Sequence, residues 1–375
     1  MKKIFLTTMA LLTMASASAF GMYGVDSDWI DFLTHGNQFR ARLEQLGFTL
    51  GNDTIKGTFG FDSPSSTLGQ IFSTGTDGTA SWYPNISAGI GYTSSAISVG
   101  VGYNATIGNK WKGVDGKNHR QAAHTPVLVL NALDNAFRMA IPIQVFSTKD
   151  IQANNNSSST NSMTAVSLDP QFRYYTGLDF LPQIRLLIYY GHQETQSNDT
   201  KTKFDSFGFQ FRIYFGSMVE EVALQPILRI QYKTALGKHG AADIRAVSFA
   251  RNSDFTNVSS YDRDKAAYQV LIRPSLGLTA NSDVVSLYVE PYLGYAINED
   301  GYNGNKVTHD LNYGVYGEIY VRPLQNLEWY FEAELGNYLD GATFTAGGET
   351  TDCTLNKRGL GFNASTGITW YLPAL

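Results

Sequence analysis

The chain has 375 residues, of which 16% are charged, with a formal net charge of −5 and with 36 Gly, 22 Tyr and 22 Phe. No basic run accompanies this charge, so the composition gives no reason to expect nucleic acid as a partner. The single cysteine, Cys353, excludes a disulfide framework. After the amino-terminal stretch, no apolar run approaches the roughly 18 residues of a membrane helix, which excludes a helical membrane protein.

The first predicted element is a secretory signal peptide over residues 1–19. Lys2 and Lys3 precede an apolar stretch over 4–14 that is too short to span a bilayer, and an A-x-A cleavage site ends at Ala19. We therefore expect the chain to be exported and cleaved after Ala19.

Residues 20–53 form the predicted amino-terminal segment, which precedes a β-barrel over 54–375. Apolar side chains recur at helical spacing over 37–47, where Asn37 is placed to cap a helix and Gly47 to end it. We expect one short amphipathic helix there, although the same stretch also alternates well enough to be a strand.

Alternating apolar and polar segments recur from residue 54 onward, each bounded by turn residues, and predict about 14 strands. The predicted strands are 54–62, 86–93, 96–108, 125–133, 136–147, 164–177, 182–192, 205–216, 221–235, 266–280, 284–298, 309–323, 327–339 and 359–372. A strand over 39–50, together with another over 22–33, would raise the count to 16. We favour 14 because this number leaves both chain ends in the periplasm without those two strands.

Long and short gaps alternate between these strands. The long gaps are 63–85, 109–124, 148–163, 193–204, 236–265, 299–308 and 340–358. Such alternation is typical of an outer-membrane barrel with short periplasmic turns and long extracellular loops. The sequence therefore predicts an all-β, antiparallel up-and-down transmembrane β-barrel of about 14 strands, with 16 as the alternative.

Two of the long gaps contain especially polar stretches. Residues 152–162 and 193–203 cannot bury enough apolar surface to offset their ordering entropy, so we expect them to be solvated and mobile. The largest gap, 236–265, is long enough to hold local structure or to fold into the lumen, and the sequence leaves both alternatives open.

The stretch SFGFQFRIYFG, residues 206–216, illustrates the two faces of a predicted strand. Its phenylalanines occupy one parity, whereas Gln210 and Arg212 occupy the other. A secreted β-sandwich would alternate in the same way. A closed barrel in lipid is favoured by an apolar row on every strand, by strand lengths near the ~9–11 residues of a membrane strand, and by aromatic pairs at strand ends such as Trp370-Tyr371. We expect the phenylalanines to face acyl chains.

Residue types that carry catalysis or bind metals do not cluster in the sequence. The six histidines, at 35, 119, 124, 192, 239 and 309, lack ligand spacing, and the nucleophile motif of hydrolases is absent. We expect no enzyme, no cofactor and no metal, and we set an outer-membrane hydrolase aside.

Charged residues on the polar parity separate by sign along the chain. Basic residues come from the middle strands and acidic residues from the late strands. In a closed barrel they would form facing walls and a transverse field across any water path, or they would pair with neighbours and simply fill the lumen. The predicted lumen-facing charges are Arg138, Arg173, Arg185, Arg212, Arg229, Lys233, Arg273, Glu290, Glu318, Glu328, Glu332 and Glu334.

Two extended stretches resemble a known family. DWIDFLTHGNQFRARLEQLGFTLGNDTIKGTFGF (28–61), which follows a signal leading into FGMYG, and the closing GLGFNASTGITWYLPAL (359–375) resemble the variable surface proteins of intestinal spirochaetes of the genus Brachyspira. The resemblance implies an abundant, surface-exposed outer-membrane antigen whose family members differ from one another. It implies no catalytic residue and no cofactor.

Two functional hypotheses follow, and they do not exclude each other. The first is an outer-membrane barrel that acts as a variable surface antigen, with outer-membrane lipid around it and host immune factors as partners. The second is a passive porin or nutrient-diffusion channel for small solutes. The sequence leaves the oligomeric state open.

Overall fold

The computed structural model describes most of the chain. The described residues are 29–42, 45–62, 72–74, 80–82, 85–111, 117–152, 161–197, 200–219, 222–238, 240–244, 263–302, 304, 307–337, 355–356 and 361–373. The signal peptide predicted over 1–19 lies outside these ranges and stays a prediction.

The described chain is almost entirely β-structure. One short 3-10 helix, η1 (Trp29–Thr34), precedes the strands. The strands are β1 (Gln38–Arg42), β2 (Gln45–Gly51), β3 (Ile55–Asp62), β4 (Phe72–Thr74), β5 (Ala80–Trp82), β6 (Asn85–Tyr92), β7 (Ile97–Trp111), β8 (Lys117–Ala132), β9 (Phe137–Gln152), β10 (Asn161–Leu168), β11 (Gln171–Leu178), β12 (Leu181–Ser197), β13 (Thr200–Tyr214), β14 (Ser217–Val219), β15 (Val222–Ala235), β16 (Tyr268–Asn281), β17 (Val285–Glu299), β18 (Thr308–Leu324), β19 (Leu327–Gly336), β20 (Leu355–Asn356) and β21 (Gly361–Tyr371). Within the described ranges, no helix is long and apolar enough to cross a membrane.

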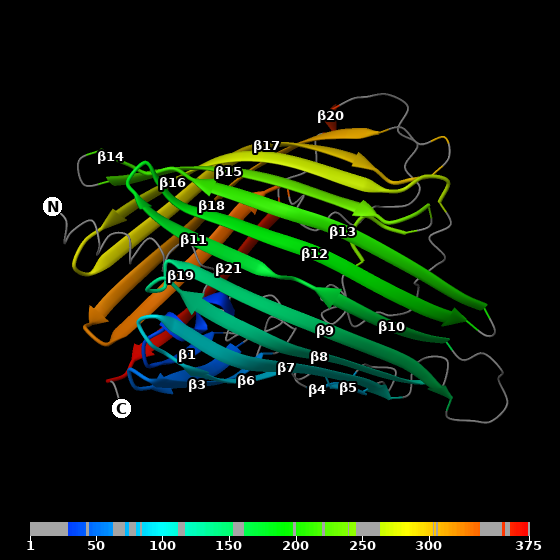
Figure 1. Cartoon of the computed structure of the whole chain (residues 1–375), viewed down its shortest axis with the longest axis horizontal. Coiled ribbons are helices and arrows are strands. Elements are labelled where there is room, and N and C mark those ends of the chain that lie inside the picture. The colour runs from blue at the N-terminus through cyan, green and yellow to red at the C-terminus, as the bar shows by residue number, and fades with distance from the viewer. Residues whose placement is uncertain are drawn as a thin grey trace.

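Sixteen strands, each antiparallel to its neighbours, close into a barrel (Figure 1). The order around the barrel is β1, β2, β3, β6, β7, β8, β9, β10 with β11, β12, β13 with β14, β15, β16, β17, β18, β19 and β21. Closure occurs where β1 pairs with β21, from Gln38 opposite Tyr371 to Arg42 opposite Gly367. The β4–β5 hairpin pairs with β7, and β20 lies outside the barrel, parallel to β18. A closed sheet has no edge strand, which is what a lipid environment requires.

The strands predicted from residue 54 onward are all present, and the barrel has the alternative count of 16 strands. The helix predicted over 37–47 is wrong, because these residues belong to β1 and β2. Asn37 caps no helix; its side-chain amide donates hydrogen bonds of 2.8 Å to the backbone oxygens of Gly51 and Pro373. Strand pairing with β21 overrides the helical spacing of a few apolar residues.

The two extra strands differ in position from those of the sixteen-strand alternative. That alternative placed one strand over 39–50 and another over 22–33. The structure instead divides 38–51 into two short strands, and the described part of 22–33 lies in η1. Splitting one stretch into a hairpin lets β1 begin and β21 end at the same end of the barrel.

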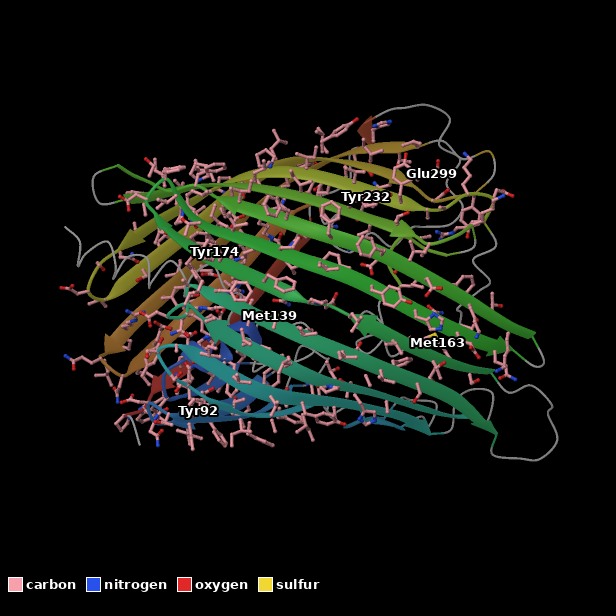
Figure 2. The ribbon with its side chains drawn as sticks, viewed as in Figure 1. Tyr92, Met139, Met163, Tyr174, Tyr232 and Glu299 are labelled. Atoms are coloured by element: carbon pink, nitrogen blue, oxygen red, sulfur yellow. The ribbon has the colours of Figure 1, made fainter. Side chains whose placement is uncertain are left out.

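The outer surface of the barrel is apolar and the inner surface is polar. Large exposed apolar side chains outside include Ile90, Val101, Phe207, Ile272, Leu293 and Trp329. Tyr92 and Tyr174, labelled in Figure 2, are 55% and 43% exposed. Gln210 is only 1% exposed on the inner face, so the expected orientation of its strand is confirmed. In the aromatic pair Trp370-Tyr371 only Trp370 lies outside, because successive side chains alternate between faces.

The two ends of the barrel differ, as the alternation of gaps predicted. Turns of two to four residues join strands at one end, at 52–54, 93–96, 133–136, 179–180, 282–284 and 325–326. The described strand ends that border the connections 63–84, 153–160, 236–267, 300–307 and 337–360 lie at the opposite end. Strand β1 begins and β21 ends at the short-turn end, on the left in Figure 1.

Two predicted long gaps are instead largely strand. Most of 109–124 belongs to the paired strands β7 and β8. The loop expected over 193–203 is instead strand, because β12 and β13 continue through its described residues as a paired hairpin. Lys201 and Lys203 are 58% and 63% exposed, so these side chains are solvated as expected. Glu194 forms ion pairs with Lys201 and Lys203, each at 3.1 Å. Cross-strand pairs of opposite charge stabilise a ribbon that its polar composition alone marks as a loop. Most of the other polar stretch, 152–162, lies outside the described residues.

The connection between β15 and β16 turns into the barrel where the structure describes it. Ala241 and Ile244 pack against Phe204 on the inner face of β13. The backbone N–H of Ile244 donates to the Ser206 hydroxyl at 3.1 Å. Residues 240–244 therefore cover part of the inner wall near the long-connection end.

Candidate functional site in the lumen

Six arginines form a continuous row on the inner wall, which we call the arginine row. Each lies directly opposite the next in the register of neighbouring strands from β9 to β16. In order around the wall they are Arg138, Arg173, Arg185, Arg212, Arg229 and Arg273. Like charges directly opposite one another destabilise a sheet, so the row needs compensating contacts.

Helix η1 supplies a counter-charge at one end of the row. Asp31 accepts hydrogen bonds from Arg138 through Oδ1 at 2.8 Å and from Arg173 through Oδ2 at 2.5 Å. Burial by itself raises the pKa of Asp31, but the charges of Arg173 and Arg138 lower that pKa to about 2. Asp31 therefore stays ionised and ties η1 to the wall.

Helix η1 also packs on a part of the inner wall where glycines stand in place of larger side chains. Trp29, Phe32 and Leu33 pack on apolar residues of β8 and β9. A Cβ atom added at any of four glycines of β6 and β7 would meet one or more of these three side chains. The glycines are Gly89, Gly91, Gly100 and Gly102. Their missing side chains make the room in which η1 lies, and its burial adds an apolar anchor to the ion pairs.

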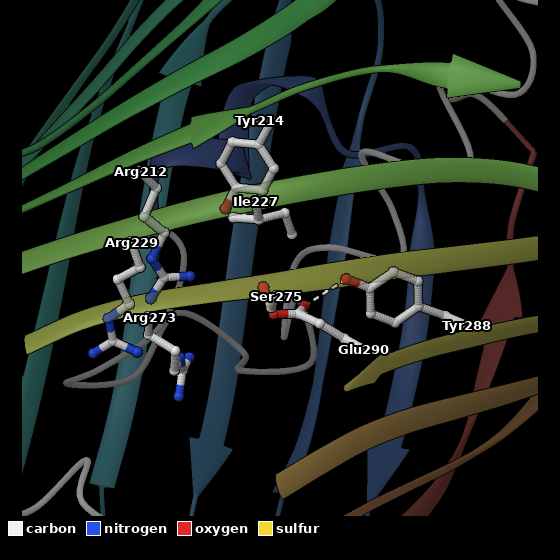
Figure 3. A pocket seen from close by; sticks show the side chains of 8 residues that line it. All are labelled: Arg212, Tyr214, Ile227, Arg229, Arg273, Ser275, Tyr288 and Glu290. Carbon is white, nitrogen blue, oxygen red and sulfur yellow. Dashed lines mark hydrogen bonds between the residues drawn. The ribbon is translucent and has the colours of Figure 1, made fainter. Parts of the chain in front are cut away.

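The other end of the arginine row lines a small pocket (Figure 3). The guanidinium groups of Arg212, Arg229 and Arg273 lie close together there. Glu290 also lines the pocket, and its carboxylate accepts hydrogen bonds from Ser275 at 2.8 Å and Tyr288 at 2.5 Å. The space of about 30 Å³ suits a water molecule or a group of carboxylate size.

Tyrosine rings cover several guanidinium groups of the row. The pairs, with the distance from the guanidinium carbon to the ring centroid, are Arg138 with Tyr175 (4.8 Å), Arg185 with Tyr214 (4.9 Å) and Arg273 with Tyr292 (4.5 Å). Arg229 donates to Gln231 Oε1 at 2.8 Å. These contacts offset part of the repulsion along the row.

The predicted acidic residues lie on β17 to β19 and accept hydrogen bonds from tyrosine hydroxyls. Tyr316 and Tyr320 donate to the two carboxylate oxygens of Glu318 at 2.5 and 2.9 Å. The other hydroxyl donors are Tyr288 to Glu290, Tyr292 to Glu334, Tyr316 to Glu332, and Tyr371 to Glu328. Two of these glutamates also bind cations, Glu332 to Arg42 and Glu328 to Arg322, both at 2.7 Å. A hydroxyl stabilises a carboxylate without cancelling its charge.

The remaining predicted cation, Lys233, binds an inward-folded segment. It pairs with Asp243 at 2.7 Å and lies over the ring of Tyr189. Asp243 belongs to residues 240–244, just as Asp31 belongs to η1. Two segments that enter the lumen from opposite ends thus bring acidic side chains to the basic wall.

Several residues that contact the twelve predicted charges, or that make room for η1 beside them, were not singled out in the sequence. These are Asp31, Asp243, the luminal tyrosines and the glycines under η1. The tyrosines occupy the same strand parity as the luminal charges, and this pattern in the sequence could have identified them as lumen-facing. Within the described ranges, no three His, Cys, Asp or Glu side chains gather as a metal site.

The sequence matches one protein family over residues 2–371, described as the Serpulina hyodysenteriae variable surface protein. The chain belongs to this family. The match covers nearly the whole chain and confirms the resemblance carried by its two terminal stretches. A variable surface protein that closes into a barrel with an apolar exterior is a transmembrane β-barrel of the outer membrane.

Two solved structures are similar to this variable surface protein at low identity. CdiB from Acinetobacter baumannii is 8% identical with a TM-score of 0.42, and the match covers 89% of this chain and 59% of that chain. The copper transporter OprC is 9% identical with a TM-score of 0.38, at 80% and 60% coverage. The chain spans less than two thirds of either structure, and these similarities carry no functional argument. No curated protein matches the sequence.

Proposed function

We propose that the chain is a surface-exposed variable antigen, whose barrel anchors its long connections on the outside of the cell. The observation that supports this is that the described strand ends bordering the long connections gather at one end of the barrel. Lipid and strand pairing constrain the wall, whereas connections at the surface tolerate sequence change. Host immune factors are the partners that such an end would meet.

Cysteine labelling on intact cells tests this orientation. With Cys353 replaced by Ser, Lys201→Cys at the long-connection end is expected to react with a membrane-impermeant maleimide, because Lys201 is exposed there. Asp283→Cys, in an exposed turn at the opposite end, serves as the matched control and is expected to react only after permeabilisation. The opposite pattern would invert the proposed topology.

Passive diffusion of small polar solutes is a second candidate function. Barrels of sixteen strands are of the size class that can enclose an aqueous channel. The arginine row on β9 to β16 and the glutamates on β17 to β19 would set a transverse field across any water path. This separation of charge is the observation that favours a channel.

Conductance in planar bilayers tests the channel. The native chain is expected to give stable ion-selective steps, and Arg212→Glu with Arg229→Glu is expected to move the reversal potential toward cation selectivity, because two positive luminal charges become negative. Lys201→Glu with Lys203→Glu changes charge equally outside the row and should have little effect. A silent bilayer containing correctly folded protein would remove this candidate.

A further inference from the structure

The arginine row already holds one carboxylate. Asp31 bridges two arginines of adjacent strands, with each carboxylate oxygen accepting from a different guanidinium. Charge-assisted contacts of this kind are short and strong, and guanidinium groups match the geometry of carboxylates. The contact shows which ligand chemistry suits two arginines paired across strands.

The same pairing of arginines recurs further along the row. Arg212 lies opposite Arg229, and Arg229 lies opposite Arg273, in the same antiparallel register that places Arg138 opposite Arg173. Directly opposed residues of antiparallel strands stand about 4.5–5.5 Å apart at Cα. A carboxylate can therefore bridge these arginines as Asp31 bridges the first two.

The pocket at these three arginines has the charge and size for such a ligand. Three guanidinium groups and one carboxylate, that of Glu290, belong to its described lining, which therefore carries more basic than acidic side chains. Glu290 is held by Ser275 and Tyr288, and the nearby space of about 30 Å³ suits one carboxylate group of a solute.

We propose that Arg212, Arg229 and Arg273 form a binding site for small carboxylate anions on the inner wall of the barrel. If the barrel is a channel, small carboxylate anions are the solutes that this site would select. The biological role of the site therefore rests on the proposed channel function. Binding itself does not require conduction, so the two can fail separately.

Equilibrium dialysis with radiolabelled succinate tests the site on the purified full chain in uncharged detergent. An ionic strength of about 0.01 M keeps the Debye length near 30 Å and preserves the attraction. Saturable binding is expected. Arg212→Gln with Arg229→Gln is expected to weaken it about tenfold or more, because two charge-assisted contacts are lost. These substitutions also remove like-charge repulsion, so the barrel should still fold.

Lys201→Gln with Lys203→Gln is the matched control, since it removes two positive charges from the same chain outside the row. It should bind succinate as the native chain does. Absence of saturable binding to the native chain, or native binding by the Arg212 and Arg229 variant, would overturn the site. Succinate binding with a silent bilayer would uphold the site and contradict the channel. Conductance without succinate binding would uphold the channel and overturn the site.

Discussion

Replacing Phe211 with Glu is expected to block insertion of the barrel into a membrane. Phe211 lies at the centre of the outward row on β13, opposite Leu186 of β12 and Ile230 of β15. The substitution loses about 2 kcal/mol of apolar burial in lipid and adds the cost of a carboxylate at hydrocarbon depth. Against a net stability of roughly 5–15 kcal/mol, the two effects together are large. Insertion is measured by refolding into vesicles and following the folded band on unheated gels.

Gln231→Glu provides the matched control on the opposite face of the neighbouring strand. Arg229 donates to Gln231 Oε1 at 2.8 Å, so the new carboxylate would gain an ion pair there. This variant should insert as the native chain does. Normal insertion of Phe211→Glu would show that the phenylalanine row does not contact lipid.

The strand positions could be read from the sequence because the two environments of the wall impose a period of two on every strand. Strand β15 shows this well, with Pro226 outside and Gln225 and Ile227 inside. Strands β1 and β2 were missed because a short stretch satisfied both the helical and the extended spacing. Pairing of β1 with the distant strand β21 and of β2 with β3 distinguishes the two, and residue spacing alone does not reveal these pairings.

The arginine row depends on the pairing register between neighbouring strands. The alternation of side chains along a single strand does not reveal that register. Its members come from strands joined by turns and loops of different lengths, and a slip of one residue would move an arginine to the lipid face. Asp31 was equally hidden, since its partners Arg138 and Arg173 are 107 and 142 residues away. The glycines on the luminal parity of β6 and β7 were the one local sign of a docked segment.

Replacing Asp31 with Asn is expected to release η1 from the wall and to speed hydrogen exchange of residues 29–35 about 100-fold. Asn keeps the shape of Asp but lacks its charge. Arg138 and Arg173 then lose a shared counter-ion while their side chains are only 14% and 4% exposed. Breaking a buried pair in this way costs about 3 kcal/mol. This cost raises the equilibrium constant for local opening of η1 about 100-fold. Exchange is followed by mass spectrometry in detergent.

Asp205→Asn is the control for this variant. Asp205 is 36% exposed on β13 and binds Tyr190 and His192, away from η1. Its loss should leave exchange at η1 unchanged. Unchanged hydrogen exchange in Asp31→Asn would show that the apolar packing of η1 over the glycines of β6 and β7 holds the helix without the ion pairs.

If η1 is released, Arg138 and Arg173 become available to solutes, and the variant should bind more succinate than the native chain. Loss of the tethered carboxylate would then open a second pair of arginines in the row to the free one.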